Sequence, residues 1–173
     1  MEIERLAVTV FKGNDIVSPD NESANIWKEL GISEKRIKYL GEDDNWWPNM
    51  ESTGPCGPDT EIFYFRSEDE VPEEFDTSDE RWVEIWNNVF MQYNHNEDGT
   101  FTELPQKNVD TGMGVERVTA LLEGKTDNYT SSIWYDIIKT IEKVAHLEYK
   151  GHEKEMRIIA DHIRSAVFIS ADP

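Results

Sequence analysis

The sequence predicts an α+β fold in which an antiparallel β-sheet is flanked by helices and followed by C-terminal helices. Residues 81–93 interleave polar residues with aromatic and β-branched ones, as a half-buried strand does. A turn at 94–99 then precedes strand-like runs at 101–104 and 108–111, which predicts an antiparallel meander. Apolar residues recur at helical spacing in three segments between 115 and 169. The 173 residues suit one domain with a hydrophobic core.

The N-terminal part of the chain predicts shorter elements. Residues 6–11, Leu-Ala-Val-Thr-Val-Phe, are rich in β-branched residues and form the first expected strand. Residues 23–30 show helical spacing of apolar residues, and Gly31 stands where a helix ends. Turn-forming residues dominate 41–58, so we expect an irregular loop there, followed by a strand at 60–65.

The remaining elements are an acidic loop and the three helices. Residues 68–80 contain eight acidic residues and no basic one, which is typical of a solvated surface loop. The helices are expected at 115–122, 131–147 and 153–169, and Gly124 marks the end of the first. Acidic residues open the third helix, where the helix dipole favours them.

Composition limits the classes of function. The 36 Asp and Glu outnumber the 17 Lys and Arg, so the net charge of −19 argues against an exposed basic face that grips nucleic acid by itself. The 6 Trp, 6 Tyr and 7 Phe argue against disorder. A single cysteine cannot form an internal disulfide, which favours a cytoplasmic location. The N-terminus is acidic and no apolar run approaches the ~18 residues of a membrane span, so no membrane partner is expected.

The sharpest local pattern is residues 110–117, Asp-Thr-Gly-Met-Gly-Val-Glu-Arg, in which a strand end and two glycines precede a helix. Glycines at such a turn let a flat or anionic ligand approach the backbone, and amides of the first helical turn can point at it. Arg117 lies off the apolar helix face. The local pattern alone leaves it open whether Arg117 binds a ligand or is a solvated surface residue.

Two other features have simpler interpretations. The two Gly-Pro pairs in residues 53–58 stiffen the chain. Cys56 lies between them with no basic neighbour in sequence, so a small buried residue is favoured over a thiol nucleophile. The four histidines lack metal-ligand spacing, and no metal site is predicted.

Several segments, taken in order, resemble the catalytic domain of the alanyl-tRNA synthetase family. The Thr-Gly-Pro-Cys-Gly-Pro, Asp-Thr-Gly-Met-Gly-x-Glu-Arg and Ala-Asp-His-Ile-Arg-Ser strings are close to diagnostic in this order. The resemblance runs from about Leu6 to the last residue. The segments that carry it are Asn45-Trp46-Trp47, 53–58, 60–63, 84–92, 109–117 and 159–165.

The resemblance implies a class II aminoacyl-tRNA synthetase, built on an antiparallel sheet. Such an enzyme is a ligase that joins alanine to ATP as alanyl-adenylate and then charges tRNA(Ala). It implies ATP and Mg²⁺ as cofactors, and alanine, ATP and tRNA(Ala) as partners. Residues 1–130 would be a partial aminoacylation core, from after motif 2 through motif 3, and 131–173 would lead into the tRNA-recognition region.

The resemblance also implies roles for individual residues in binding alanine. Asp110 matches the carboxylate that pairs with the α-ammonium group, a charge-assisted contact. Trp47 matches the aromatic wall beside the substrate, and Val89 the residue that limits the methyl pocket. Gly112 matches one of the close-packed glycines beside the adenylate.

A second group of residues is implied in ATP binding. Arg117 matches the motif 3 arginine that holds ATP phosphates and offsets transition-state charge. Gly114 is the second glycine beside the adenylate, and Trp47 borders this site as well. Arg117 and Asp110 are therefore the expected catalytic residues, in a reaction that depends on positioning and electrostatics rather than a protein nucleophile.

The sequence departs from the family pattern at Glu51, Ser52, Asp59 and Phe65; Asp59 stands where another Cys is usual. Motifs 1 and 2 should precede Leu6, so a separate chain is a possible source of both. We expect the chain alone to be weak or inactive, with an unpaired strand edge where the preceding strands would add. Two alternatives remain. One is a non-catalytic protein, derived from a synthetase, that binds alanine or a nucleotide or interacts with another protein. The other is an acidic α+β domain without a ligand.

Overall fold

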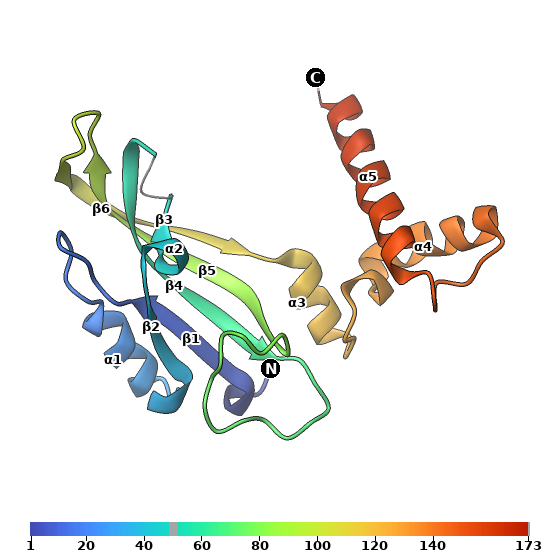
Figure 1. Cartoon of the computed structure of the whole chain (residues 1–173), viewed down its shortest axis with the longest axis horizontal. Helices are drawn as coiled ribbons and strands as arrows, with labels where there is room; N and C mark the ends of the chain where they lie inside the picture. The colour runs from blue at the N-terminus through green and yellow to red at the C-terminus, as the bar shows by residue number, and fades with distance from the viewer. Residues whose placement is uncertain (49–51, 173) are drawn as a thin grey trace. The chain divides into compact units, whose positions relative to one another are not determined.

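The computed structural model describes residues 1–48 and 52–172, which divide into two compact units, Met1–Gly114 and Val115–Pro173. The first unit contains all the strands and the second is helical (Figure 1). This arrangement of a helix-flanked sheet followed by helices confirms the predicted α+β class. In the described part of the chain no helix combines the length and apolar character needed to cross a membrane.

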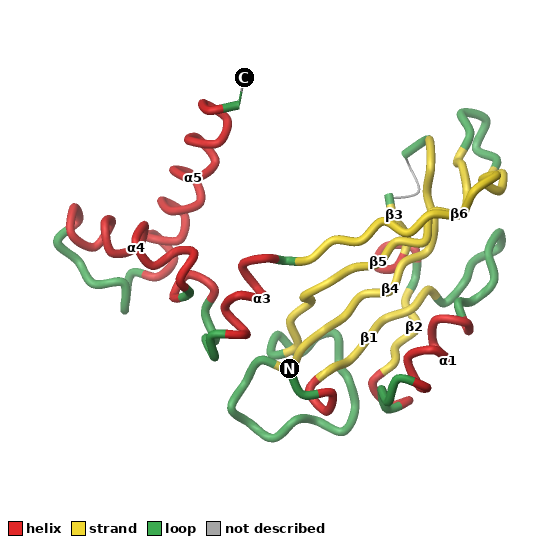
Figure 2. Tube along the Cα trace, turned by 180° about the vertical axis from the view of Figure 1, so that it is seen from behind, coloured by secondary structure: helices red, strands yellow, loops and turns green. Residues whose placement is uncertain are grey.

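The sheet of the first unit has the strand order β2-β1-β4-β5-β6, and a short sixth strand, β3, pairs with β4. Figure 2 shows these strands as neighbouring yellow segments. The strands are β1 (Leu6–Phe11), β2 (Ile37–Leu40), β3 (Trp46–Trp47), β4 (Gly54–Phe65), β5 (Trp82–His95) and β6 (Phe101–Met113).

The predicted meander is confirmed, because β4, β5 and β6 pair antiparallel in succession. The two runs expected at 101–104 and 108–111 belong to the single strand β6, whose register against β5 shifts between Met91 and Tyr93. β2 is an addition that the sequence analysis missed. It pairs parallel with β1, so the sheet is antiparallel except for this pair.

The loop expected at 41–58 is wrong in part. A helical turn, α2 (Glu42–Asn45), leads into β3, and β4 begins at Gly54 rather than at residue 60. Gly57 permits the extended pairing, because a Cβ there would lie 1.9 Å from the Phe90 carbonyl oxygen of β5. The register of β4 against β5 shifts between Cys56 and Asp59, and this irregularity accommodates the prolines, which cannot donate to a ladder.

One helix packs against the N-terminal strands. α1 (Asn21–Glu29) begins two residues before the predicted start, where the Asp20 side chain caps it by accepting from Ser23 N at 2.9 Å. A cluster of apolar side chains joins α1 to the β1–β2 pair: Val8, Val10, Ala24, Ile32 and Ile37. Two 3₁₀ turns, η1 (Ile3–Arg5) and η2 (Glu34–Arg36), precede β1 and β2.

The acidic segment 68–80 is a loop, as predicted, and an aromatic anchor holds it. Phe75 is fully buried and packs 5.2 Å from Trp82 and 5.0 Å from Phe63, measured between ring centroids. Lys35 pairs with Glu73 at the surface of the loop. The loop is therefore solvated on one side and fixed to the sheet on the other.

The second unit confirms the three predicted helices, with ends shifted by up to two residues. They are α3 (Val115–Leu122), α4 (Ser132–Ala145) and α5 (Glu153–Ala171), with a 3₁₀ turn, η3 (Asn128–Thr130), before α4. Their core consists of Trp134, Ile138, Ile141, Met156 and Ala160. Asp127 in the α3–α4 connection pairs with Arg157 of α5 at 2.7 Å, which fixes that connection.

Candidate functional site

The register of the sheet gathers three of the predicted site residues, Val89, Asp110 and Gly112, on one face. Asp59 of β4, Val89 of β5 and Asp110 of β6 lie opposite one another in a cross-strand row. Glu61, Asn87 and Gly112 form the next row. Directly opposed residues of antiparallel strands, and residues two apart on one strand, share a face. Val89, Asp110 and Gly112 are therefore neighbours on a face that we call the acidic face.

The exposure of these residues makes the β5–β6 end of the acidic face accessible. Val89 is buried, whereas Asp110 and Gly112 are exposed. A Cβ added at Gly112 would meet no atom within 4 Å, so this glycine leaves open space beside Asn87 rather than relieving a clash. A buried valine, an exposed carboxylate and an open glycine position thus lie side by side at this end of the face.

The two tryptophans of β3 have opposite environments. Trp46 is buried among Phe11, Tyr93 and Phe101, with ring centroids 5.3 to 6.0 Å away. Trp47 is 46% exposed, which is unusual for so large an apolar residue. Trp46 therefore anchors the strand, and Trp47 offers an accessible ring, which its predicted role as an aromatic wall requires.

A hydrogen-bond network supports the β4 end of the acidic face. The Asn45 Nδ2 atom donates to Asp59 Oδ1 at 2.8 Å and to Thr9 Oγ1 at 2.8 Å. Thr9 Oγ1 donates in turn to Glu61 Oε2 at 3.1 Å. Asn45 and Thr9 are fully buried and Asp59 is 2% exposed. The network thus joins α2, β1 and β4, with Glu61 as its partly buried member.

Two carboxyl groups of this network have raised pKa values. Burial, the largest cause, raises the pKa of Asp59 to about 6, against hydrogen bonds from Asn45 and Asn87 that lower it. Burial, followed by the nearby Glu84 carboxylate, raises the pKa of Glu61 to about 7. Perturbed carboxyl groups of this kind concentrate at functional sites.

The glycine turn after β6 continues the pairing of the sheet. The Gly114 amide donates to the Ile85 carbonyl oxygen at 3.0 Å, which extends the β5–β6 pairing up to the start of α3. Arg117 belongs to the second unit, where it is an exposed residue of α3. Its neighbour Glu116 pairs with Arg164 of α5. The structure thus brings together Val89, Asp110 and Gly112 within the first unit.

The departures from the family pattern lie in different surroundings. Phe65 is fully buried against Trp82, with ring centroids 5.1 Å apart. The Ser52 carbonyl oxygen lies 2.8 Å from His95 Nδ1, and Glu51 lies outside the described residues. Cys56 is 1% exposed and burial raises the pKa of its thiol, which confirms a small buried residue.

Sequence reasoning did not assign Asn45, Asn87, Glu61 or Thr9 to the site. Asn87 could have been found from strand alternation, since it lies two residues before Val89 on a strand that was predicted. Asp59 was noted as a departure, but the expected loop at 41–58 hid its alternation with Glu61. The link between Thr9 and Asn45 has no local signal, because it depends on tertiary contact.

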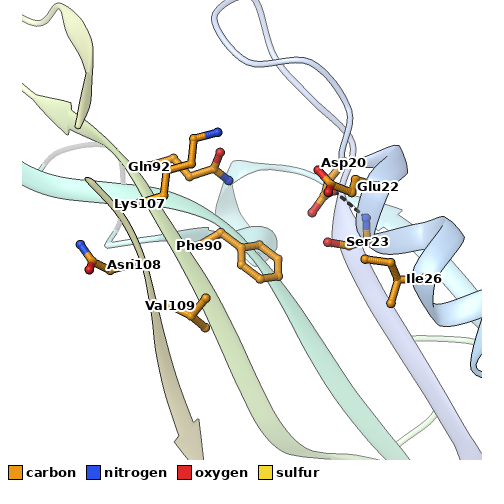
Figure 3. Close-up of a pocket in the computed structure, with 9 residues that line it drawn as sticks. All are labelled: Asp20, Glu22, Ser23, Ile26, Phe90, Gln92, Lys107, Asn108 and Val109. Carbon is orange, nitrogen blue, oxygen red and sulfur yellow. Dashed lines mark hydrogen bonds between the residues drawn. The ribbon is translucent and has the colours of Figure 1, made fainter. Parts of the chain in front are cut away.

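A cavity of about 320 Å³ lies on the other face of the sheet. Phe90 and Val109 line it and alternate with Val89 and Asp110 along their strands. Figure 3 shows Phe90 pointing toward Ser23 and Ile26 of α1. It contains none of the predicted site residues, which separates it from the acidic face.

Comparison with known proteins shows one consistent similarity. The family model described as tRNA synthetases class II (A) matches residues 1–173. An alanine–tRNA ligase of Treponema denticola is 48% identical over 176 residues, covering 99% of this chain and 29% of that protein. Those of Borreliella burgdorferi and Nitrosococcus oceani are 45% and 43% identical, over 98% of this chain and 29% and 19% of their own lengths. The chain thus spans less than a third of each of these relatives.

Proposed function

The chain belongs to the class II tRNA synthetase (A) family, and from that premise we propose that it forms a central part of the catalytic domain of an alanine–tRNA ligase. In the first step the carboxylate of alanine attacks the α-phosphorus of ATP, and pyrophosphate leaves. In the second step a terminal hydroxyl group of tRNA(Ala) attacks the alanyl carbonyl carbon, and AMP leaves.

The observation that carries the proposal is the placement of Val89, Asp110 and Gly112 together on the acidic face. Asp110 pairs with the α-ammonium group, since its carboxylate is exposed on the edge strand β6 and can make a charge-assisted contact with a bound cation. Val89 provides the floor for the methyl group, and Gly112 leaves room for the adenylate. The exposed ring of Trp47 borders alanine and the nucleotide.

ATP and Mg²⁺ are the proposed cofactors. Arg117 holds phosphate oxygens and offsets the negative charge that develops during adenylate formation, and Gly114 borders the nucleotide. Among the described residues no group of three or more His, Cys, Asp or Glu side chains is placed to hold a metal. We propose that Mg²⁺ enters on the ATP phosphates, because Mg²⁺ keeps waters and needs few protein ligands.

We propose that residues 1–130 act as the aminoacylation core and that 131–173 lead into a tRNA-recognition region. The relatives extend well beyond the matched region, so motifs 1 and 2 would come from polypeptide outside this sequence or from a separate chain. tRNA(Ala) would bind in the context of those parts. The fragment is thus proposed as a substrate-binding portion rather than an independent ligase.

The first test measures binding of a non-hydrolysable alanyl-adenylate analogue by isothermal titration calorimetry. Removing the carboxylate with Asp110→Asn should weaken binding about 100-fold, because a charge-assisted contact is lost. The control Asp15→Asn makes the same change at an exposed position and should leave affinity unaltered. Equal affinity for the wild-type chain and Asp110→Asn would contradict the proposed role.

A further inference from the structure

Asp59 is the buried acid of the cross-strand row that includes Val89 and Asp110. At 2% exposure its carboxylate is solvated by protein donors instead of water. A buried carboxylate is stable only when such donors surround it. Its partners therefore show what the carboxylate does in this position.

Two side-chain amides donate hydrogen bonds to the Asp59 carboxylate. Asn45 Nδ2 donates to its Oδ1 atom at 2.8 Å, and the Asn87 side chain makes a second hydrogen bond to it. An ionised carboxylate only accepts, so each amide has to turn its NH₂ group toward Asp59. The Oδ1 atoms of Asn45 and Asn87 are consequently buried without a hydrogen-bond partner among the described residues. The carboxylate thus favours this orientation of both amides.

Asn45 connects this orientation to the aromatic wall. It is the last residue of α2, and β3 with Trp47 follows directly. Its Nδ2 atom also contacts the Asp59 carbonyl oxygen at 3.3 Å and Thr9 Oγ1 at 2.8 Å. One amide group therefore ties the start of β3 to both β1 and β4.

We propose that Asp59 is a positioning residue of the acidic face: it orients the Asn45 and Asn87 amides and, through Asn45, holds the strand that carries Trp47. The consequence for alanine rests on the proposed function, in which Trp47 and Val89 border the substrate. Asp59 itself touches neither alanine nor ATP in this account. Its loss should weaken alanine binding by loosening groups that do.

The charged surroundings of Asp59 make its protonation measurable. Glu61 lies on the same strand, Glu84 lies on β5 and Asp44 lies in α2. Burial is the largest cause of the raised pKa of Asp59, and the carboxylates of Glu84 and Asp44 raise it further. With a pKa of about 6, Asp59 gains a proton between pH 7 and pH 5. A protonated carboxyl group has one O–H donor and keeps its carbonyl oxygen as an acceptor, so it no longer requires both amides to face it with their NH₂ groups.

The direct test uses the unaltered chain and follows the Asn45 and Asn87 side-chain NH₂ resonances by NMR from pH 5 to pH 8. Both should titrate together with the Asp59 carboxyl carbon, with a midpoint near the pKa of about 6. Resonances that stay constant over this range would overturn the proposal. This measurement needs no ligand, so it remains decisive even if the proposed function fails.

The second test compares Asp59→Asn with Asp43→Asn, which neutralises an exposed residue of the same α2 segment. In chains labelled with 5-fluorotryptophan, Asp59→Asn should shift the ¹⁹F resonance of Trp47, and Asp43→Asn should not. An unmoved Trp47 resonance in a folded Asp59→Asn variant would overturn the positioning role.

Binding of the alanyl-adenylate analogue completes this comparison. Asp59→Asn should weaken it about tenfold, as expected for loss of a hydrogen bond to a charged group, with no change in Asp43→Asn. Unchanged affinity in Asp59→Asn would overturn the link to alanine. If the wild-type chain binds no analogue, the proposed function fails, and the amide titration and the Trp47 resonance decide the positioning role.

Discussion

Two carboxyl groups on β4 give the folded chain a pH dependence of stability opposite to that of an acid whose pKa is lowered by folding. The pKa values of Asp59 and Glu61 are raised to about 6 and about 7, from ordinary values of 3.8 and 4.5. The native state therefore favours their protonated forms relative to the unfolded chain. Their stabilising contribution is complete below pH 4 and is lost as the pH rises through 6 and 7.

We expect the free energy of unfolding of Asp59→Asn to fall less than that of the wild-type chain between pH 4.5 and pH 7.5. The amide carries no ionisable proton, so the difference should approach, at most, about 3 kcal/mol for a shift of roughly two pKa units. Urea denaturation at several pH values measures it, with Asp43→Asn as the exposed control. Parallel pH profiles for the wild type and Asp59→Asn would show that Asp59 ionises as freely in the folded chain as in the unfolded one.

Strand β4 depends on one glycine for its approach to β5. A Cβ on Gly57 would lie 1.9 Å from the Phe90 carbonyl oxygen, a backbone atom that cannot move aside alone. Gly112 on β6 is in the opposite situation, since a Cβ there would meet open space. The two glycines therefore separate a folding requirement from a binding requirement.

Gly57→Ala should lower the free energy of unfolding by about 3 kcal/mol or more, because the β4–β5 pairing must distort to admit the methyl group. Gly112→Ala should change it by less than about 0.5 kcal/mol and should instead weaken binding of the alanyl-adenylate analogue. Thermal and urea unfolding measure the first effect and calorimetry the second. A stable Gly57→Ala chain would refute the close approach.

The acidic loop is held by burial rather than by ion pairs. Phe75→Ala should destabilise the chain by about 3 to 5 kcal/mol, since it removes a fully buried ring from the cluster around Trp82. Glu73→Gln breaks the exposed pair with Lys35 and should change stability by less than about 1 kcal/mol. Urea denaturation of the two variants shows whether the buried Phe75 ring or the Lys35–Glu73 ion pair contributes more to stability. A larger loss in Glu73→Gln would reverse this assignment.

Elements with a strong local pattern could be predicted from the sequence. The alternation before Tyr93 predicts β5, and the apolar stripe around Ile138 predicts α4. β2 and the start of β4 could not be predicted in this way. β2 has only four residues and depends on β1 for its pairing. β4 begins with a Gly-Pro-rich stretch that has loop-like composition and becomes extended only because Gly57 fits against β5.

For the molecule as a whole, the residues of the candidate site that are proposed to face the ligand could be predicted from the sequence. The buried residues that hold them in place could not. Val89, Asp110 and Gly112 lie within motif strings, so the family resemblance identified them and the register places them together. Thr9 and Asn45 are 36 positions apart, and only the folded sheet joins them. Buried polar partners of this kind leave no periodic signal, because each is a single residue in its own segment.

The edge of the sheet is consistent with a chain that forms part of a larger catalytic domain. Among the described residues β6 pairs with β5 alone, and most of its 13 residues are exposed. Long unpaired edges attract further strands. In a relative, a segment of polypeptide precedes the matched region. If that segment is added to this chain, we expect it to pair with β6 and extend the sheet beside Asp110.

Alanine-dependent exchange of pyrophosphate into ATP tests the central claim most directly. The chain alone should show little or no exchange, and addition of the preceding segment of an alanine–tRNA ligase relative should restore it. The restored activity should be lost in Asp110→Asn and retained in Asp15→Asn. Absence of exchange in the combined chains, despite their association and binding of the alanyl-adenylate analogue, would contradict the account and leave a non-catalytic binding protein.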